Sequence, residues 1–80
     1  MKLPRDLSGR DLAQALGVFG YAITRQSGSH LRLTTQERGE HHVTIPDHPA
    51  LRVGTLAAIL GEVTTHFQLE RAEVICRLFA

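Results

Sequence analysis

The sequence contains little cysteine and no long apolar run, and each of these shortages excludes a class of protein. A single cysteine, Cys76, among 80 residues excludes an internal disulfide and a zinc site built from several cysteines. No run approaches the roughly 18 apolar residues of a membrane-spanning helix. The first six residues also lack the apolar segment of a signal peptide. We therefore expect a cytoplasmic protein that does not associate with a membrane.

The charges of the chain are almost balanced. Nine basic and eight acidic residues give a formal net charge of +1, and Lys2 is the only lysine beside eight arginines. The planar guanidinium of arginine binds phosphate through two parallel hydrogen bonds, although a GC-rich genome produces the same bias. Because the net charge is so small, any surface that binds nucleic acid must come from local clustering of arginines.

The length of the chain predicts one domain with one hydrophobic core. We assign residues 1–80 to this domain, with the core at about 8–63 and a C-terminal helix at about 66–78. A chain of this size buries only roughly 60–65% of its unfolded surface. A partner, or a second copy, that covers apolar surface would therefore add stability.

The N-terminal segment has the pattern of a capped amphipathic helix. Ser8 and Asp11 have the spacing of a capping box, and Gly20 is suited to end the helix in a left-handed conformation. Between them lies an apolar stripe at helical spacing, made of Leu12, Ala13, Leu16 and Phe19. The pattern predicts a helix over residues 9–19.

Three β-prone segments follow, and their short connections allow only an antiparallel meander. The expected strands cover residues 21–26, 30–35 and 40–45. In the second strand Leu31 and Leu33 alternate with His30 and Arg32, so the two pairs lie on opposite faces. In the first strand the same alternation places Arg25 with Tyr21 and Ile23.

The last part of the chain is predicted to be helical. Two prolines in residues 46–49 stop the sheet, and Gly54-Thr55 opens a helix with Leu56, Ile59, Leu60 and Val63 as its apolar face. Residues 66–78 form a further apolar periodic segment, with His66 expected in its first turn on the surface and Cys76 buried. This segment covers either the core or a partner. The predicted class is α+β, with the element order of double-stranded-RNA-binding domains.

Five histidines are the most conspicuous chemical feature, and four of them lie between residues 30 and 48. His41 and His42 are neighbours on a strand, so they point to opposite faces and cannot bind one metal ion together. We expect both to be solvated or half-buried, and we expect no metal or other cofactor. His48 lies between two prolines in a rigid loop, where functional residues often sit.

His30 is the strongest candidate for chemistry among them. It starts a strand directly after Gly28, which can adopt backbone angles closed to other residues, and Ser29 adds a hydroxyl. Histidine exchanges protons near neutral pH because its free pKa is about 6.5. These residues alone leave two interpretations open, an ordinary surface histidine and a catalytic one.

The wider pattern resembles the HicA (YcfA-like) toxin family over residues of about 8 to 63. The resemblance rests on Gly28-Ser29-His30, on the run from His42 to His48, and on Gly54-Thr55-Leu56 followed by Ile59-Leu60. Members of that family are mRNA interferases of toxin–antitoxin systems. The resemblance implies a fold like that of double-stranded-RNA-binding domains and metal-independent cleavage of RNA by one histidine, here His30. It also implies an antitoxin of the HicB type that covers the active face.

On this basis the expected RNA-binding residues are Gly28, Ser29, Arg32, Arg25, His48, Arg52, Gly54 and Thr55. Arg32 lies on the face of His30 and is placed to stabilise charge on a reacting phosphate, whereas backbone amides at the start of the Gly54 helix can hold a phosphate. Members of the family are commonly lysine-rich around this second helix, and here it has no basic residue before His66. That departure favours an alternative function, a non-catalytic module that binds RNA or an antitoxin. The apolar C-terminal segment suggests antitoxin contact or self-association.

Overall fold

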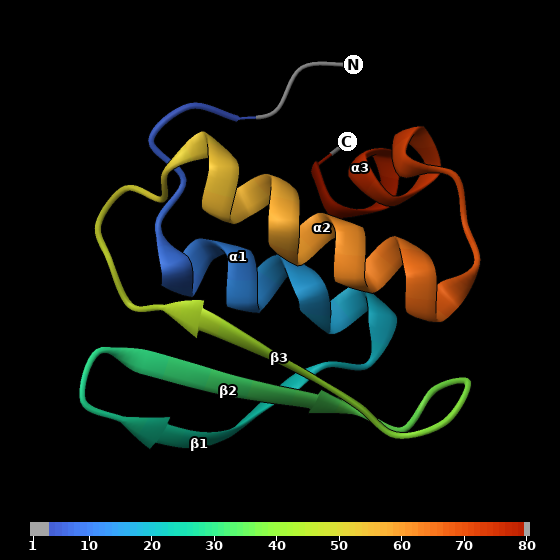
Figure 1. Cartoon of the computed structure of the whole chain (residues 1–80), viewed down its shortest axis with the longest axis horizontal. Coiled ribbons are helices and arrows are strands. Elements are labelled where there is room, and N and C mark those ends of the chain that lie inside the picture. Colours follow the sequence, from blue (N-terminus) through green and yellow to red (C-terminus); the bar gives the residue numbers. More distant parts are fainter. Residues whose placement is uncertain (1–3, 80) are drawn as a thin grey trace.

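The computed structural model describes residues 4–79 and confirms the α+β class. The helices lie on one side of a three-stranded sheet, and the other side of the sheet is open (Figure 1). The elements are, in order, α1 (Gly9–Ala15), the 3₁₀ turn η1 (Leu16–Phe19), β1 (Ala22–Ser27), β2 (His30–Thr35), β3 (His41–Pro46), α2 (Val53–Phe67) and α3 (Arg71–Phe79).

The predicted start and end of the first helical segment are both confirmed. The Ser8 hydroxyl accepts a hydrogen bond from the Asp11 amide at 3.0 Å, and the Asp11 carboxylate accepts one from the Ser8 amide at 3.4 Å. The segment ends at Gly20, which has a φ of 82°. A Cβ at this position would also lie 2.8 Å from the Thr35 hydroxyl. Glycine is therefore required there both by the backbone angle and by the space available.

The strands form an antiparallel sheet in the order β1-β2-β3, as the short connections predict. Leu31 pairs with Ile45 and Leu33 pairs with Val43, and all four side chains are buried beneath the helices. Because side chains alternate along a strand, His30 and the other even-numbered residues of β2 lie on the open face. The predicted division of β2 into two faces is confirmed.

One predicted orientation is wrong, because β1 contains a bulge. Ile23 pairs with Leu33, but Arg25 pairs with Arg32, so Thr24 is an extra residue in β1. A bulge shifts the alternation by one position for the rest of the strand. Arg25 therefore does not share a face with Ile23 and lies on the open face with its partner Arg32.

The helices complete a single core on the covered face of the sheet. The predicted apolar face of α2 is buried, and α3 packs against α2 and η1. In α3 the buried residues are Val74, Ile75 and Leu78. The apolar C-terminal segment thus covers the core of its own chain.

The boundary between the last two helices differs from the prediction. Apolar residues continue at helical spacing through this boundary, and no glycine or proline marks it. Nevertheless, Gln68 adopts a left-handed φ of 55° and ends α2. His66 therefore lies half-buried in the last turn of α2 rather than in the first turn of the next helix. Cys76 is exposed rather than buried, because α3 turns Val74, Ile75 and Leu78 toward the core.

Candidate active site on the open face of the sheet

A small pocket on the open face of the sheet contains the strongest sequence candidate. Its volume is about 200 Å³, and side chains from all three strands line it, namely Arg25, Ser27, His30, Arg32 and Thr44. Cross-strand pairing explains why they meet, because His30 lies opposite Ser27 and Arg32 lies opposite both Arg25 and Thr44. The structure thus brings together three predicted residues and adds Ser27 and Thr44.

The position of His30 follows from the tight turn that precedes it. Gly28 has a φ of 57° as the first residue of the two-residue connection between β1 and β2. A positive φ at this position is what the type II′ hairpin turn requires. The turn lets β2 begin at His30 itself, and its side chain is exposed at the end of the sheet. A ligand that lies on the open face can reach it directly.

The two arginines of the pocket provide positive charge beside His30. Within residues 4–79, neither the Arg25 nor the Arg32 guanidinium forms an ion pair with a carboxylate. Both side chains are exposed and lie on paired positions of neighbouring strands. Two unpaired guanidinium groups at one pocket are suited to bind an anion such as phosphate.

Gly28 and Ser29 form the turn before His30, and His48 lies in the loop after β3, but none of the three lines the pocket. The Asp47 amide donates to the Ser29 carbonyl at 2.6 Å, which joins the loop after β3 to the turn. The His48 carbonyl in turn accepts from the Gly9 amide at 3.0 Å. His48 is exposed next to the turn but does not line the pocket of His30.

The remaining predicted residues lie in the helical layer. Arg52 occupies the N-cap position of α2 without a side-chain capping bond, and Gly54 and Thr55 are in the first turn of this helix. Arg52 borders a different depression, which it shares with Arg5 and other residues near the start of the chain. The structure therefore does not bring Arg52, Gly54 or Thr55 into the pocket of His30.

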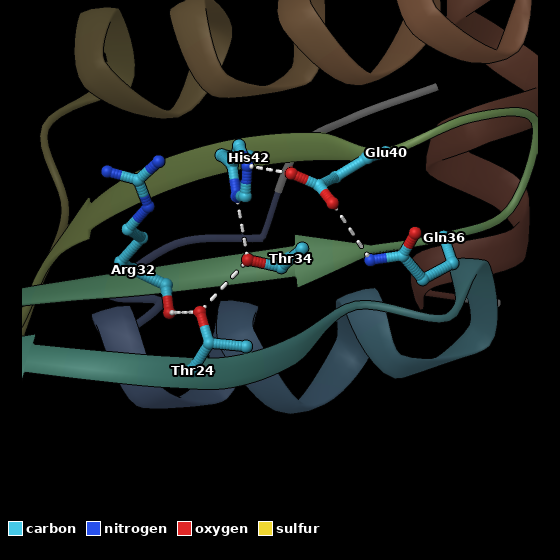
Figure 2. Close-up of polar contacts among 6 residues, drawn as sticks. All are labelled: Thr24, Arg32, Thr34, Gln36, Glu40 and His42. Carbon is cyan, nitrogen blue, oxygen red and sulfur yellow. Dashed lines mark hydrogen bonds and ion pairs between the residues drawn. The ribbon is translucent and has the colours of Figure 1, made fainter.

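A hydrogen-bonded network that the sequence did not reveal adjoins the pocket (Figure 2). The His42 ring bonds to the Thr34 hydroxyl through Nδ1 at 2.7 Å and to the Glu40 carboxylate through Nε2 at 2.9 Å. The Thr34 hydroxyl lies 2.9 Å from that of Thr24 in β1. The register of β2 and β3 would have revealed this network, because Thr34 and His42 are direct cross-strand partners.

The Glu40 carboxylate at the end of this network is held in its charged form. A hydrogen bond from the Gln36 side chain lowers the pKa of Glu40, and the bond and charge of His42 lower this pKa further. Arg32 adds a weaker attraction from the pocket side. Glu40 is therefore a hydrogen-bond acceptor near neutral pH.

His41 belongs to a second group of histidines, on the helical side of the sheet. Its ring stacks on that of His66 with centroids 4.4 Å apart, and its Nδ1 lies 2.7 Å from the Tyr21 hydroxyl. The His66 ring bonds through Nε2 to the Glu37 carbonyl at 2.9 Å. His41 and His42 thus point to opposite faces, as predicted, and both are half-buried.

Burial and neighbouring charges shift the proton equilibria of this second group. Burial, and then the charge of Glu62, raise the pKa of Tyr21 to about 12. Burial, and then the neighbouring His66, lower the pKa of His41. Both shifts favour the neutral forms of Tyr21 and His41. Among residues 4–79, no three histidine, cysteine, aspartate or glutamate side chains come together as metal ligands would.

Comparison with known proteins identifies the family of the chain. Residues 9–64 match the family model described as the HicA toxin of bacterial toxin–antitoxin systems. Neither the search of curated proteins nor that of solved structures produced a match. The matched region is well over half of the chain and contains the turn, the pocket and the network described above. The chain therefore belongs to the HicA toxin family.

Proposed function

We propose that this protein is the toxin of a type II toxin–antitoxin system and that it acts as an endoribonuclease that cleaves mRNA. The observation that carries the proposal is the pocket in which an exposed His30 lies with Arg25 and Arg32, both without a carboxylate partner in the described chain. A proton-transfer group beside two phosphate-binding groups is the minimum that RNA cleavage without a metal needs.

The chemistry we propose uses the RNA's own nucleophile. The 2′-oxygen of one nucleotide bonds to the adjacent phosphorus while the bond from phosphorus to the 5′-oxygen breaks. His30 either takes the proton of the attacking 2′-hydroxyl, while water protonates the departing 5′-oxygen, or gives a proton to that oxygen, while water takes the proton of the 2′-hydroxyl. The products are a 2′,3′-cyclic phosphate and a 5′-hydroxyl. General acid or base catalysis of this kind contributes roughly 10²–10⁴-fold to a rate.

Arg25 and Arg32 are proposed to stabilise the charge that builds up on the phosphate oxygens. They approach the pocket from neighbouring strands, so one phosphate can receive hydrogen bonds from both. The hydroxyls of Ser27 and Thr44 line the same pocket and can donate to the remaining oxygens. Donors held in place before the reaction are the usual means of stabilising a developing oxyanion.

An antitoxin partner follows from the family, and we propose that it is a HicB-type protein that binds over the open face. The pocket of His30 lies on the side of the sheet that the helices leave uncovered (Figure 1). A protein that lies on this face excludes RNA simply by occupying it.

The test compares the purified protein with its His30→Ala variant on RNA in excess chelator. We expect the wild type to release fragments with 2′,3′-cyclic phosphate ends and the variant to be slower by roughly 10²–10⁴-fold. His66→Gln is the matched control, since His66 lies outside the pocket and should leave cleavage unchanged. A His30→Ala variant that still cleaves RNA and still arrests growth would exclude His30 as the catalytic group.

The uncharged start of α2 supports a second candidate, a module of the same fold that binds RNA or the antitoxin without cutting. The first turn of α2 has no acidic residue, and its sequence up to His66 has no basic one. Phosphate contacts supply most non-specific affinity for nucleic acids, so few basic residues mean weak RNA binding. Binding of RNA by the pure wild type without any cleavage would favour this candidate.

A further inference from the structure

The network beside the pocket connects a backbone carbonyl in one strand to a carboxylate at the far end of the sheet (Figure 2). The Thr24 hydroxyl donates to the Arg32 carbonyl at 3.3 Å, and it also bonds to the Thr34 hydroxyl at 2.9 Å. His42 continues the chain from Thr34 to Glu40, with bonds of 2.7 and 2.9 Å. The chain thus runs from Arg32 through Thr24, Thr34 and His42 to Glu40.

Counting protons along this chain shows what the four bonds together require of His42. A carbonyl oxygen and a carboxylate only accept hydrogen bonds. Thr24 therefore uses its one proton on the Arg32 carbonyl, and Thr34 must use its own on Thr24. The two remaining bonds, to Thr34 and Glu40, then need a proton on each ring nitrogen of His42. All four bonds exist together only when His42 is an imidazolium.

The Thr24 end of the network lies at the β1 bulge, which shapes the pocket. Thr24 is the extra residue of the β1 bulge, and the carbonyl it binds belongs to Arg32, the partner of Arg25 across the strands. The bulge is the reason that Arg25 lies on the open face. A bond that holds Thr24 against Arg32 therefore holds Arg25 in the pocket.

We propose that Thr24, Thr34, His42 and Glu40 form a positioning network that is complete only with a doubly protonated His42 and that holds Arg25 beside His30 through the bulge. This inference rests on the proposed function, since it assigns the network to RNA cleavage. His42 acts through Arg25 and not on the substrate. His30 and Thr34, the partner of His42, are four residues apart on β2, which corresponds to roughly 13 Å. One phosphate cannot contact both histidines at that separation.

The charged groups around His42 are few and come from three places. Glu40, in the turn before β3, is its ion-pair partner, and Arg32 of β2 lies close enough to act on Glu40. His41 precedes it on β3 but points to the helical side. A neutral His42 has only one ring proton, so one bond of the network is then lost and the bulge is held less firmly.

The experiment follows the network by NMR and the reaction by kinetics, on the full chain. Ring ¹⁵N signals report the protons on His42, and the backbone amides of Thr24 and Arg25 report the bulge. We expect two protonated ring nitrogens in the wild type at mildly acidic pH. Loss of one proton on raising the pH should shift the bulge amides together with the ring signals. The kcat for RNA should fall over the same range, with little change in KM.

Two pairs of variants separate positioning from mere stability. Thr34→Val removes a member of the network and should lower kcat between about 10- and 100-fold at mildly acidic pH, the effect expected of a small misplacement. This difference from the wild type should shrink as the pH rises. Thr34→Ser keeps the hydroxyl and should restore both kcat and the bulge signals. Glu40→Gln offers an amide N–H that can donate to a neutral His42, so the bulge amides should stop responding to pH.

Three results would overturn the proposal. The first is a His42 ring with a single proton wherever the protein is folded, and the second is a Thr34→Val variant with the bulge signals and kcat of the wild type. The third is a Glu40→Gln variant whose bulge responds to pH as the wild type does. If the wild type does not cleave RNA, the proposed function fails, while the NMR measurements still decide whether His42 controls the bulge.

Discussion

His41 and His42 are consecutive residues that have entirely different surroundings. On the open face, His42 joins hydroxyls and a carboxylate next to the pocket of His30. On the helical side, His41 packs between Tyr21 and His66 and connects the sheet to the end of α2. The residue type is the same, but His42 belongs to a hydrogen-bonded network on the open face and His41 to a contact between the sheet and the helices.

The difference shows that surroundings, rather than residue type, assign a role to a histidine. A strand places successive side chains on opposite faces of its sheet, and in this protein only one face is covered by helices (Figure 1). The open face can gather unpaired arginines, because water and ligands reach them there. The covered face favours neutral groups, as the lowered pKa of His41 and the raised pKa of Tyr21 show.

The largest effect is expected from His30→Ala, which should reduce cleavage strongly without reducing stability. Cleavage should fall by roughly 10²–10⁴-fold, whereas the free energy of unfolding should change by less than about 0.5 kcal/mol, since the side chain is exposed. Denaturant unfolding beside the cleavage assay checks this. If the variant loses activity because it unfolds, His30 has a structural role rather than a catalytic one.

Arg32→Ala should have the next largest effect, again on cleavage and not on stability. Loss of one donor to a developing oxyanion typically costs about 10²–10³-fold in kcat. Arg32→Lys keeps the charge but not the two-pronged guanidinium, so it should recover activity only in part. Single-turnover cleavage of a defined RNA measures both. Wild-type activity in both the alanine and the lysine variants would show that neither the charge nor the fork of Arg32 is used.

Tyr21→Phe should give the opposite result on the helical side. It removes the hydroxyl bonded to His41, so the free energy of unfolding should fall by about 1 kcal/mol. Cleavage by the folded variant should match the wild type, because Tyr21 does not line the pocket. Denaturant unfolding and cleavage kinetics on the same preparation test this prediction. A loss of cleavage without a loss of stability would show that the Tyr21–His41 contact also supports activity.

The smallest effect is expected in the pH dependence of stability. The lowered pKa of His41 means that the unfolded chain binds this proton more readily, so stability falls as the pH drops below the ordinary value of 6.5. The pKa of Tyr21 is raised from 10.0 to about 12, so stability also falls as the pH rises through this interval. Thermal unfolding across pH should show both losses, with the acid loss reduced in His41→Gln and the alkaline loss reduced in Tyr21→Phe.

Features that depend on neighbouring residues could be predicted from the sequence. The capping box at Ser8, the left-handed end at Gly20 and the two faces of β2 rest on hydrogen bonds or alternation within a few residues. The catalytic role of His30 rests on the glycine turn before it and on the resemblance of the wider sequence to a family, and it stays a prediction. The sequence by itself thus determined the α+β class, the meander and the side of the sheet on which His30 lies.

Only the tertiary structure decided which residues accompany His30. The bulge at Thr24 depends on how β1 pairs with β2, and it reverses the face predicted for Arg25. The bond between Thr34 and His42 likewise depends on the register of β2 and β3. The turn at Gln68 and the exposure of Cys76 reflect how α2 and α3 pack. These contacts join residues that are distant in sequence, so the local periodicity of the sequence does not predict them.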